Sequence, residues 1–522
     1  MVDPDDQQET IDFLSRPETY GVQSPVERVE THVAIVFLAG DKAYKLKRAV
    51  QYAYLDFSTP DKRKAVCETE VALNRRTAPD LYIGVESVNR GPDGTLTFAP
   101  GEPVDWLVVM HRFAADDLLD AVARRGELDD LLVRELVDEI ASFHDKAEIV
   151  PVADGAHRVE EVIEGNFASM DALPAGLLPE TEIRELRAES FSALKQLAPL
   201  LDRRGSTGHV RHCHGDLHLA NICLWQGRPT LFDCLEFDPG LATIDVLYDL
   251  AFLIMDLVRE GLREQASLVF NRYLDMREER EGVAELPLFL SMRAAVRAHV
   301  TATAGLRRED GTGIARALDE ARDYLTLARS FLVQSEPCLV AIGGFSGTGK
   351  STLAGALATE VGTAPGARWL RTDVLRKRLA GVAPEASLPE EAYKPERNTA
   401  VYGQLMERAG QLLAAGRSVI VDAVFANQAE REQVAAIASE LNIPFVGLWL
   451  EAPADLLLKR VGGRRGGVSD ADSSVVMRQL EYEIGDLSGW QAINASGSAA
   501  KTLAQARSAL GVVCQTVRAP HS

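Results

Sequence analysis

A glycine-rich segment between two apolar runs constrains the fold of this chain more than any other feature. Residues 344–351 read Gly-Phe-Ser-Gly-Thr-Gly-Lys-Ser and fit the pattern G-x-x-x-x-G-K-[ST] at every fixed position. The apolar run 338–342 before this segment is typical of a buried strand, and residues 352–358 after it are typical of a helix. A strand, a loop of this kind and a helix predict an α/β P-loop domain built on a parallel sheet.

The same segment predicts a nucleotide site. Its glycines let backbone N–H groups converge on phosphate oxygens, and the N-terminus of the following helix adds partial positive charge. We expect Lys350 to reach the β- and γ-phosphates and the Ser351 hydroxyl to bind Mg²⁺, so ATP and Mg²⁺ are the predicted cofactors. The alternative, a turn that binds no ligand, is disfavoured by the complete strand, loop and helix. The predicted nucleotide-binding residues of this loop are Gly344, Phe345, Ser346, Gly347, Thr348, Gly349, Lys350, Ser351 and Thr352.

Charge and composition exclude several classes of partner. The formal net charge of −21 argues against DNA or RNA, because a protein that binds a phosphate backbone presents a basic face. No apolar run reaches membrane-spanning length, and the N-terminal residues lack a signal-peptide pattern. The 6 cysteines form no C-x-x-C pair, which is typical of reduced thiols. We therefore expect a cytoplasmic protein with a small-molecule substrate and no membrane partner. Nothing in the sequence predicts the oligomeric state.

A polar segment that ends in proline, residues 334–337, lies directly before the P-loop strand and predicts a linker between two domains. The region 338–522 then alternates strands and helices, as expected for a P-loop domain with a parallel sheet. Its further strands are expected at 368–371, 418–421 and 445–450.

The region before this linker has a part with short strands and becomes helical from residue 117. Residues 1–30 are polar and acidic and are expected to form a mobile lead-in with one short helix. Residues 31–110 contain short strand candidates, among them a hairpin of 31–38 with 42–47, and one helix, 62–76, as in the small lobe of a two-lobed kinase. Residues 111–333 are mainly helical, with apolar residues at helical spacing in 118–147, 180–201, 244–261, 263–274, 286–305 and 313–333.

A cluster of His, Cys and Asp residues interrupts these helices. Asp216 and Asn221 form the spacing D-x-x-x-x-N, and Asp233 follows in a strand-like context. This arrangement is typical of a kinase catalytic loop. We expect Asp216 to accept or orient the proton of a substrate hydroxyl. Asn221 and Asp233 are predicted to bind Mg²⁺, which prefers hard oxygen ligands.

At these residues the chain resembles the aminoglycoside phosphotransferase-like, or choline kinase-like, branch of the protein-kinase fold. The resemblance extends over roughly residues 30–330, the usual size of such two-lobed domains. It implies an α+β protein-kinase-like domain over 31–333, with Asp216 as the catalytic residue and Asp249 bracing the catalytic loop. The stretches that carry the resemblance are 214–218 (His-Gly-Asp-Leu-His), Asn221, 232–233 (Phe-Asp) and 244–251 (Ile-Asp-Val-Leu-Tyr-Asp-Leu-Ala).

The resemblance also implies a small-lobe lysine that binds the nucleotide. Lys45 fits this role because an alanine stands two residues before it, as in V-A-I-K, and Glu70 is its expected partner. Lys47 with Glu68 is the alternative pair, because the strand register is uncertain by one pleat. The small lobe has no G-x-G-x-x-G, so we expect a plainer loop near residues 30–32 to cover the phosphates.

A zinc site is an alternative for the same region. Its candidate ligands follow no C-x-x-C or H-x₃-H scheme with a second pair. Neighbouring residues of an extended stretch also point to opposite faces. Core cysteines are therefore favoured over zinc. The candidate ligands are Cys213, Cys223, Cys234, His212, His214 and His218.

Polar residues follow the strands of the P-loop region, where an open α/β sheet has its ligand crevice. Asp373 is predicted to accept a substrate hydroxyl proton, and Arg376 or Arg378 to hold substrate anions. The alternative for Asp373 is a role as the N-cap of the next helix, and both roles are compatible. Asp422 ends a strand like a Walker B aspartate and is predicted near the Mg²⁺ ion.

Three arginines follow the strand that ends at residue 450. Arg464, with Arg460 and Arg465, is predicted to form a lid that binds the triphosphate, and a solvated surface is the alternative.

Residues 336–490 resemble small P-loop kinases of the gluconate kinase and polynucleotide kinase type. Together the two regions resemble bacterial proteins labelled bifunctional aminoglycoside phosphotransferase/ATP-binding protein. The stretches that carry the P-loop resemblance are 344–352, 371–376 (Arg-Thr-Asp-Val-Leu-Arg), 421–425 (Val-Asp-Ala-Val-Phe) and 469–472 (Ser-Asp-Ala-Asp).

Three functions are open at this level. The first is an ATP-dependent phosphotransferase with two nucleotide sites that moves the γ-phosphate to a small-molecule hydroxyl. The second is a single active P-loop kinase whose catalytically silent N-terminal domain recognises a substrate or a partner. The third is a non-enzymatic ATP-binding regulatory protein. The first is favoured because every base and metal position is filled.

Overall fold

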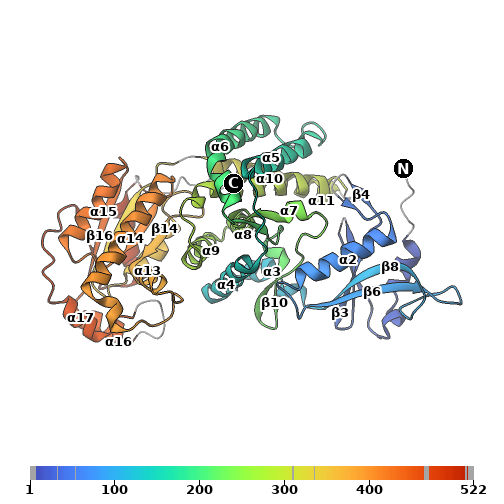
Figure 1. Cartoon of the computed structure of the whole chain (residues 1–522), viewed down its shortest axis with the longest axis horizontal. Helices are drawn as coiled ribbons and strands as arrows, with labels where there is room; N and C mark the ends of the chain where they lie inside the picture. The colour runs from blue at the N-terminus through green and yellow to red at the C-terminus, as the bar shows by residue number, and fades with distance from the viewer. Residues whose placement is uncertain are drawn as a thin grey trace. The chain divides into compact units, whose positions relative to one another are not determined.

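The computed structural model describes residues 7–31, 33–52, 55–307, 311–333, 335–463, 470–511 and 514. Figure 1 follows the chain from the N-terminus in blue to the C-terminus in red. The chain forms two compact units. The first comprises Met1–Gly155, Asp202–Asp256 and Val300–Asp319, and the second comprises Ala156–Leu201, Leu257–His299 and Glu320–Ser522. The second unit therefore combines the P-loop region with helices that precede the predicted linker.

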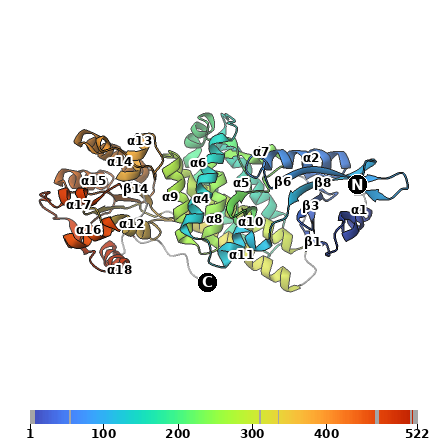
Figure 2. The same ribbon diagram turned by 90° about the horizontal axis from the view of Figure 1, so that it is seen from below.

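The first unit contains the antiparallel sheet of the small lobe, covered by a helix on each face (Figure 2). Side chains of its third strand alternate between the faces, so Ala43 packs with Val71 of α2 (Pro60–Asn74). Leu46 points to the other face and packs with Leu14 of α1 (Gln8–Leu14). The strand order is β1 (Glu27–Glu30), β2 (Ala34–Ala39), β3 (Lys42–Lys47), β8 (Glu102–His111), β6 (Tyr82–Arg90) and β7 (Leu96–Thr97).

The short helix predicted within residues 1–30 is confirmed as α1, but the described part of this segment, residues 7–30, is not a mobile lead-in. Leu14 is fully buried against Ile35 and Phe37 of β2, so α1 belongs to the small-lobe core. The Gln7 side chain donates to the Lys47 carbonyl oxygen (2.9 Å). Strand β1 extends the sheet beside β2. The polar composition concealed these contacts, because a short amphipathic helix needs only a few apolar residues.

The helical region after residue 111 matches the prediction with two differences. The predicted helix 118–147 is two helices, α3 (Leu119–Arg124) and α4 (Asp130–Lys146). Gly126 after α3 has φ +72°, and the Asp129 side chain caps α4 by accepting from the Leu132 N–H (2.9 Å). Helix α5 (Gly155–Asp171) has no counterpart in the prediction.

The remaining elements of this region, among the described residues, include five helices of more than two turns, one short helix, α7, and two antiparallel strand pairs. The helices are α6 (Glu180–Ser206), α7 (Pro239–Ala242), α8 (Val246–Arg259), α9 (Arg263–Met276), α10 (Leu286–Gly305) and α11 (Gly311–Leu332). The strand pairs are β9 (Val210–His212) with β12 (Thr243–Asp245), and β10 (Ile222–Trp225) with β11 (Arg228–Leu231).

The parallel sheet predicted after residue 337 is confirmed. Its order is β14 (Arg368–Arg371), β15 (Val419–Asp422), β13 (Leu339–Gly343), β16 (Phe445–Glu451) and β17 (Trp490–Asn494), and all neighbours are parallel. The central strand β13 is completely buried. Figure 2 shows α12 (Lys350–Ala358) and α18 (Ala499–Leu510) on one face, and α13 (Thr372–Leu379) and α14 (Pro395–Ala414) on the other.

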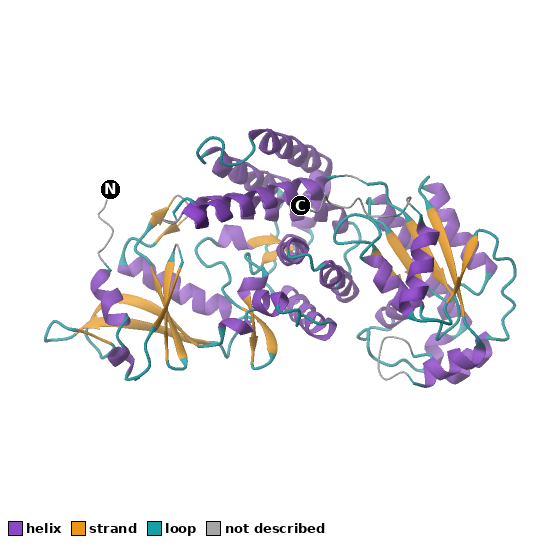
Figure 3. Ribbon diagram, turned by 180° about the vertical axis from the view of Figure 1, so that it is seen from behind, coloured by secondary structure: helices purple, strands orange, loops and turns teal. Residues whose placement is uncertain are grey.

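Figure 3 shows the strands concentrated in the small lobe and in the P-loop region. Among the described residues, no helix is both long and apolar enough to cross a membrane.

Candidate active sites

The predicted catalytic loop follows β9 and brings Asp216 and Asn221 together. The Asn221 amide donates to the Asp216 carboxylate (2.8 Å) and to its backbone carbonyl oxygen (2.9 Å). Asp249 of α8 accepts from the backbone N–H groups of His214 (3.1 Å) and Gly215 (2.9 Å), so its predicted bracing role is confirmed. Gly215 has φ +83° and lies close to Leu235, which leaves little room for a side chain there.

Asp233 joins this loop to the small lobe. It adopts φ +58°, a left-handed conformation that is uncommon outside glycine. Its carboxylate contacts the Lys45 ammonium (2.5 Å), and Lys45 also donates to Glu70 of α2 (2.9 Å). The backbone N–H of Phe232 donates to the Asn221 carbonyl oxygen (3.0 Å), which ties the Asp233 segment to the catalytic loop. The five residues predicted for this site therefore belong to one connected network.

A second lysine is part of the same network. Lys47 is completely buried and contacts both Glu70 and Glu236 at 2.5 Å. The alternative pair Lys47 with Glu68 is wrong, because Glu68 is an exposed residue whose side chain lies 4.0 Å from Lys64. Burial alone would raise the pKa of Glu70, but the ammonium groups of Lys45 and Lys47 outweigh it and hold that pKa below its ordinary value. Glu70 is therefore ionised at neutral pH.

Three buried side chains next to the catalytic loop have ligand atoms within 4.8 Å of one another. They are His144, Cys213 and Asp249. The Asp249 oxygens already accept two backbone N–H groups, and one of them contacts the His144 ring (3.1 Å). These hydrogen bonds explain why the three side chains lie together without a metal ion: Asp249 holds the catalytic loop, and His144 contacts Asp249. Among the described residues no further cluster of this kind supports the zinc alternative.

The P-loop has the backbone geometry that its glycines predict. Gly344, Gly347 and Gly349 have φ values of +136°, +86° and +95°, which favour glycine. A side chain at Gly344 would meet the Leu450 carbonyl oxygen at 2.7 Å. The Lys350 ammonium donates to the Phe345 carbonyl oxygen (3.1 Å). Helix α12 begins at Lys350, so its first N–H groups line the loop.

The two predicted metal ligands of this loop are in contact. The Ser351 hydroxyl donates to the Asp422 carboxylate (2.7 Å). Burial raises the pKa of Asp422 above its ordinary value, although the Lys350 ammonium and the Ser351 hydrogen bond oppose the shift. A hydroxyl and a carboxylate are oxygen ligands of the kind that Mg²⁺ uses beside nucleotide phosphates, so these residues fit the ion.

Asp373 lies in the first turn of α13, directly after β14. The N-cap position belongs to Arg371, so the alternative that Asp373 is the N-cap is wrong by two positions. Burial raises the pKa of Tyr393, and the Asp470 hydrogen bond and the charges of Asp470 and Asp373 add to this shift. Asp373 is therefore close to Tyr393, whose hydroxyl contacts Asp470 (2.5 Å).

The predicted anion-binding arginines are largely buried in protein contacts. Arg376 stacks on the Tyr393 ring (4.7 Å) and donates to the Ala392 carbonyl oxygen (2.8 Å). Arg378 lies near Glu278 (4.0 Å) and the Leu274 carbonyl oxygen (3.4 Å). Their roles as substrate ligands stay predictions.

The predicted lid is described only in part. Arg464 and Arg465 lie outside the described residues. Arg460 of α16 (Ala454–Gly462) donates to the Gly347 carbonyl oxygen (3.4 Å). Gln479 of α17 (Ser473–Gln479), which the motifs do not indicate, accepts from the Ser346 N–H (2.7 Å). The segment after β16 thus contacts the P-loop at two points.

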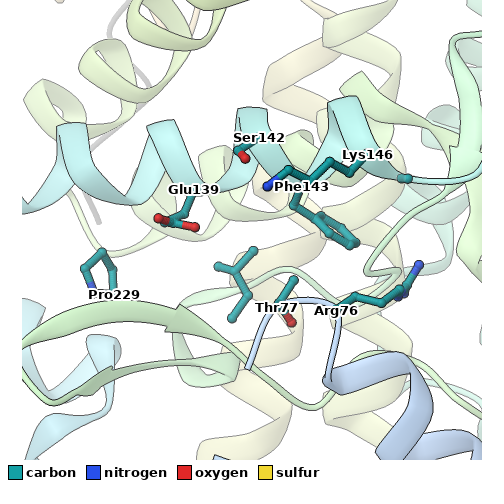
Figure 4. A pocket seen from close by; sticks show the side chains of 9 residues that line it. Arg76, Thr77, Glu139, Ser142, Phe143, Lys146 and Pro229 are labelled. Atoms are coloured by element: carbon teal, nitrogen blue, oxygen red, sulfur yellow. The ribbon is translucent and has the colours of Figure 1, made fainter. Parts of the chain in front are cut away.

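A separate pocket of about 290 Å³ lies between α4, β11 and the residues that follow α2 (Figure 4). Phe143 and Lys146 of α4 line it, and Arg76 closes one side. The Arg76 guanidinium also donates to the carbonyl oxygens of His212 (2.8 Å) and Cys213 (3.2 Å). None of the predicted catalytic residues lines this pocket.

Comparisons with known proteins match both halves of the chain. The phosphotransferase enzyme family matches residues 105–286, and the AAA domain matches residues 339–483. An uncharacterized protein of Mycobacterium tuberculosis (strain ATCC 25618 / H37Rv) is 30% identical over 467 residues, which cover 87% of this chain and 90% of that protein. A protein of Mycobacterium bovis matches to the same extent.

Solved structures resemble each half separately. A gluconokinase from Sinorhizobium meliloti 1021 is 21% identical and covers 35% of this chain and 95% of its own, with a TM-score of 0.25. A choline/ethanolamine kinase family protein from Mesorhizobium loti is 16% identical and covers 62% of this chain and 98% of its own, with a TM-score of 0.36.

Proposed function

Because this chain belongs to the same family as its mycobacterial relatives and joins a phosphotransferase-family domain to an AAA-type P-loop domain, we propose that it is an ATP-dependent kinase with two nucleotide sites. Each site transfers the γ-phosphoryl group of ATP to a hydroxyl group of a small molecule. One observation supports the proposal most strongly. Each site combines a lysine, a carboxylate for the hydroxyl proton and oxygen ligands suited to Mg²⁺.

In the first site, Asp216 accepts the proton of the acceptor hydroxyl as its oxygen attacks the γ-phosphorus. The bond from the γ-phosphorus to the β-γ bridging oxygen breaks, and ADP leaves. Lys45, which Glu70 orients at 2.9 Å, neutralises charge on the nucleotide phosphates. The hydrogen bond from Asn221 to Asp216 (2.8 Å) orients the accepting carboxylate.

In the second site, the P-loop amides and Lys350 bind the β- and γ-phosphates. The same displacement follows, with Asp373 as the group that accepts the hydroxyl proton. Asp373 is suited to this role because it lies in the first turn of α13, just after the carboxyl end of β14, the edge where parallel sheets bind ligands.

Mg²⁺ would be held by Asn221 and Asp233 in the first site and by Ser351 and Asp422 in the second. Bound there, Mg²⁺ would supply positive charge that offsets the negative charge of the nucleotide phosphates.

The test uses the purified full chain with ATP and a metabolite extract. The readouts are ADP formation and compounds that gain the mass of one phosphoryl group. We expect Asp216→Ala and Lys350→Ala each to remove a different set of products, with losses of about 10²-fold or more. Asp171→Ala and Lys459→Ala, at surface positions, are the matched controls and should change neither set.

A kinase with only the P-loop site active is the second candidate. The absence of G-x-G-x-x-G from the small lobe favours it, because that loop normally covers the phosphates in kinase folds. Product formation that Lys350→Ala abolishes and Asp216→Ala leaves unchanged would establish this candidate and contradict a two-site kinase. No product dependent on either residue would contradict both.

A further inference from the structure

Helix α9 lies within the segment that matches the phosphotransferase family, yet it belongs to the same compact unit as the P-loop sheet. Figures 1 and 2 both show α9 beside β14 and α13. Strand β14 is an edge strand of the sheet, and its inner edge pairs with β15. Edge strands expose backbone groups that need other partners. Helix α9 supplies such partners.

Asn271 of α9 pairs with the outer edge of β14 through its side-chain amide. The amide nitrogen donates to the Ala367 carbonyl oxygen (3.2 Å), and the amide oxygen accepts from the Trp369 N–H (2.8 Å). This exchange of two hydrogen bonds resembles the pairing of a neighbouring strand. The same oxygen also accepts from the Arg368 guanidinium (3.0 Å), and Asn271 is buried.

Asp275, one turn further along α9, binds both arginines at the ends of β14. It accepts from Arg368 at 2.7 Å and forms a second ion pair with Arg371. The three side chains are nearly inaccessible to solvent. Each charge is therefore stabilised by its ion-pair partners and not by water, and removing one partner would leave an uncompensated buried charge. Burial would raise the pKa of Asp275, but Arg371 and Arg368 reverse the shift and lower it, so the carboxylate is ionised.

The carboxyl end of β14, where Arg371 pairs with Asp275, is followed directly by residues of the P-loop site. Arg371 stands opposite Asp422 in the strand register. Helix α13 begins at the next residue, and Asp373 follows in its first turn. A shift of β14 along its edge would therefore move the start of α13 relative to the Walker B aspartate and the P-loop.

We propose that Asn271 and Asp275 of α9 are positioning residues for the P-loop site, which hold β14 so that the start of α13, with Asp373, keeps its place relative to Asp422. The inference rests on the function proposed above for the P-loop site. It assigns to a helix from the phosphotransferase segment a direct part in the geometry of the second kinase site. The P-loop site then depends on residues that precede the predicted linker at 334–337 in the sequence.

The first test measures turnover in full chains that carry Asp216→Ala, so that only the P-loop site contributes. The protein is given ATP and Mg²⁺, and water serves as the phosphoryl acceptor. The rate of ADP formation is divided by the amount of a fluorescent ATP analogue that the same preparation binds. For Asp275→Asn we expect kcat to fall about 10-fold or more while the KM for ATP stays within about twofold, because no hydrogen bond or ion pair of the described residues joins Asp275 to the nucleotide loop. Asn271→Ala should act in the same direction without leaving an unpaired buried charge.

Glu385→Gln is the matched control. Glu385 pairs with Arg272 of α9 but makes no contact with β14 among the described interactions, and its loss should leave kcat and KM unchanged. Equal kinetics for Asp275→Asn, Asn271→Ala and Glu385→Gln would overturn the inference. So would losses that vanish after normalisation to bound nucleotide, because they would reflect a smaller folded fraction only.

Hydrogen exchange provides a readout that does not depend on turnover. For Asp275→Asn and Asn271→Ala we expect faster exchange in a peptide covering 367–379, with the central strands β13 and β15 unchanged. Faster exchange across the whole sheet, or none in this peptide, would overturn the inference. A parent chain that forms no ADP in a Lys350-dependent manner would contradict the proposed function instead, and the exchange experiment would still decide the role of α9.

Discussion

Two lysines on β3 illustrate what single residues contribute to the first site. Lys45 and Lys47 are two positions apart on a strand, so both side chains point toward α2. Both contact Glu70, and Lys47 adds a contact to Glu236 beyond Asp233. The network thus joins β3, α2 and the segment after β11 by buried charges. Such a network is costly to break on one side, because the remaining charges stay buried.

We expect Lys47→Met to lower the free energy of unfolding of the small lobe by about 3–5 kcal/mol, because Glu70 and Glu236 lose a shared buried partner. Chemical denaturation followed by circular dichroism would measure it. Lys62→Met is the control, since Lys62 pairs with Asp56 at the surface and its loss should cost at most about 1 kcal/mol. A cost for Lys47→Met no larger than that of the control would contradict the role of the buried network.

Residues in local motifs could be predicted from the sequence, and residues that act across long sequence distances could not. Asp216, Asn221 and Asp233 were recognisable because kinase chemistry fixes their spacing. The pairing of Asp275 with Arg371 joins residues far apart in the chain. Arg371 begins a stretch that resembles P-loop kinases, but Asp275 stands in no motif. Gln479 is similar, because only the folding of the segment after β16 brings it to the P-loop.

At the scale of elements, the strands and helices with strong periodicity were predictable. The strand before the P-loop and the β2–β3 hairpin are where the apolar patterns indicate. The break between α3 and α4 has local signals, a glycine and an aspartate, but the apolar periodicity runs across both helices and conceals them. Pairing partners such as α9 and β14 depend on tertiary packing and leave no local pattern.

A buried histidine of α10, His299, predicts how the stability of the protein depends on pH. Burial lowers the pKa of His299 from 6.5 to about 4, and its ring lies 3.3 Å from the Asn166 side-chain oxygen on α5. The unfolded chain therefore binds more protons than the folded chain between these two pKa values, so stability falls as pH decreases from about 6.5 to about 4. We expect a loss of up to about 3 kcal/mol over this range.

Melting temperatures of wild type and His299→Gln between pH 4 and 7 would check this expectation. The variant should show a weaker dependence on pH than wild type. Parallel curves for the two proteins would show that His299 does not titrate in this way.

At the scale of the whole molecule, the order of two nucleotide-binding folds in one chain was predicted and is confirmed by the two family matches. The compact units do not follow that order closely, since α9 and most of α5, α6 and α10 belong to the same unit as the P-loop sheet. Sequence composition predicts a boundary where a linker is polar, but it does not show which helices pack on which sheet. The acceptor molecules are likewise undetermined by composition, because they depend on a few side chains around each site.

The most direct test of two nucleotide sites is the number of nucleotides that the full chain binds. Isothermal titration calorimetry with a non-hydrolysable ATP analogue and Mg²⁺ would measure it for wild type, Lys350→Ala and Asp233→Asn. We predict two equivalents for wild type and one for each variant, because each substitution disables a different site. A single equivalent in wild type that Lys350→Ala abolishes and Asp233→Asn leaves unchanged would contradict the two-site account.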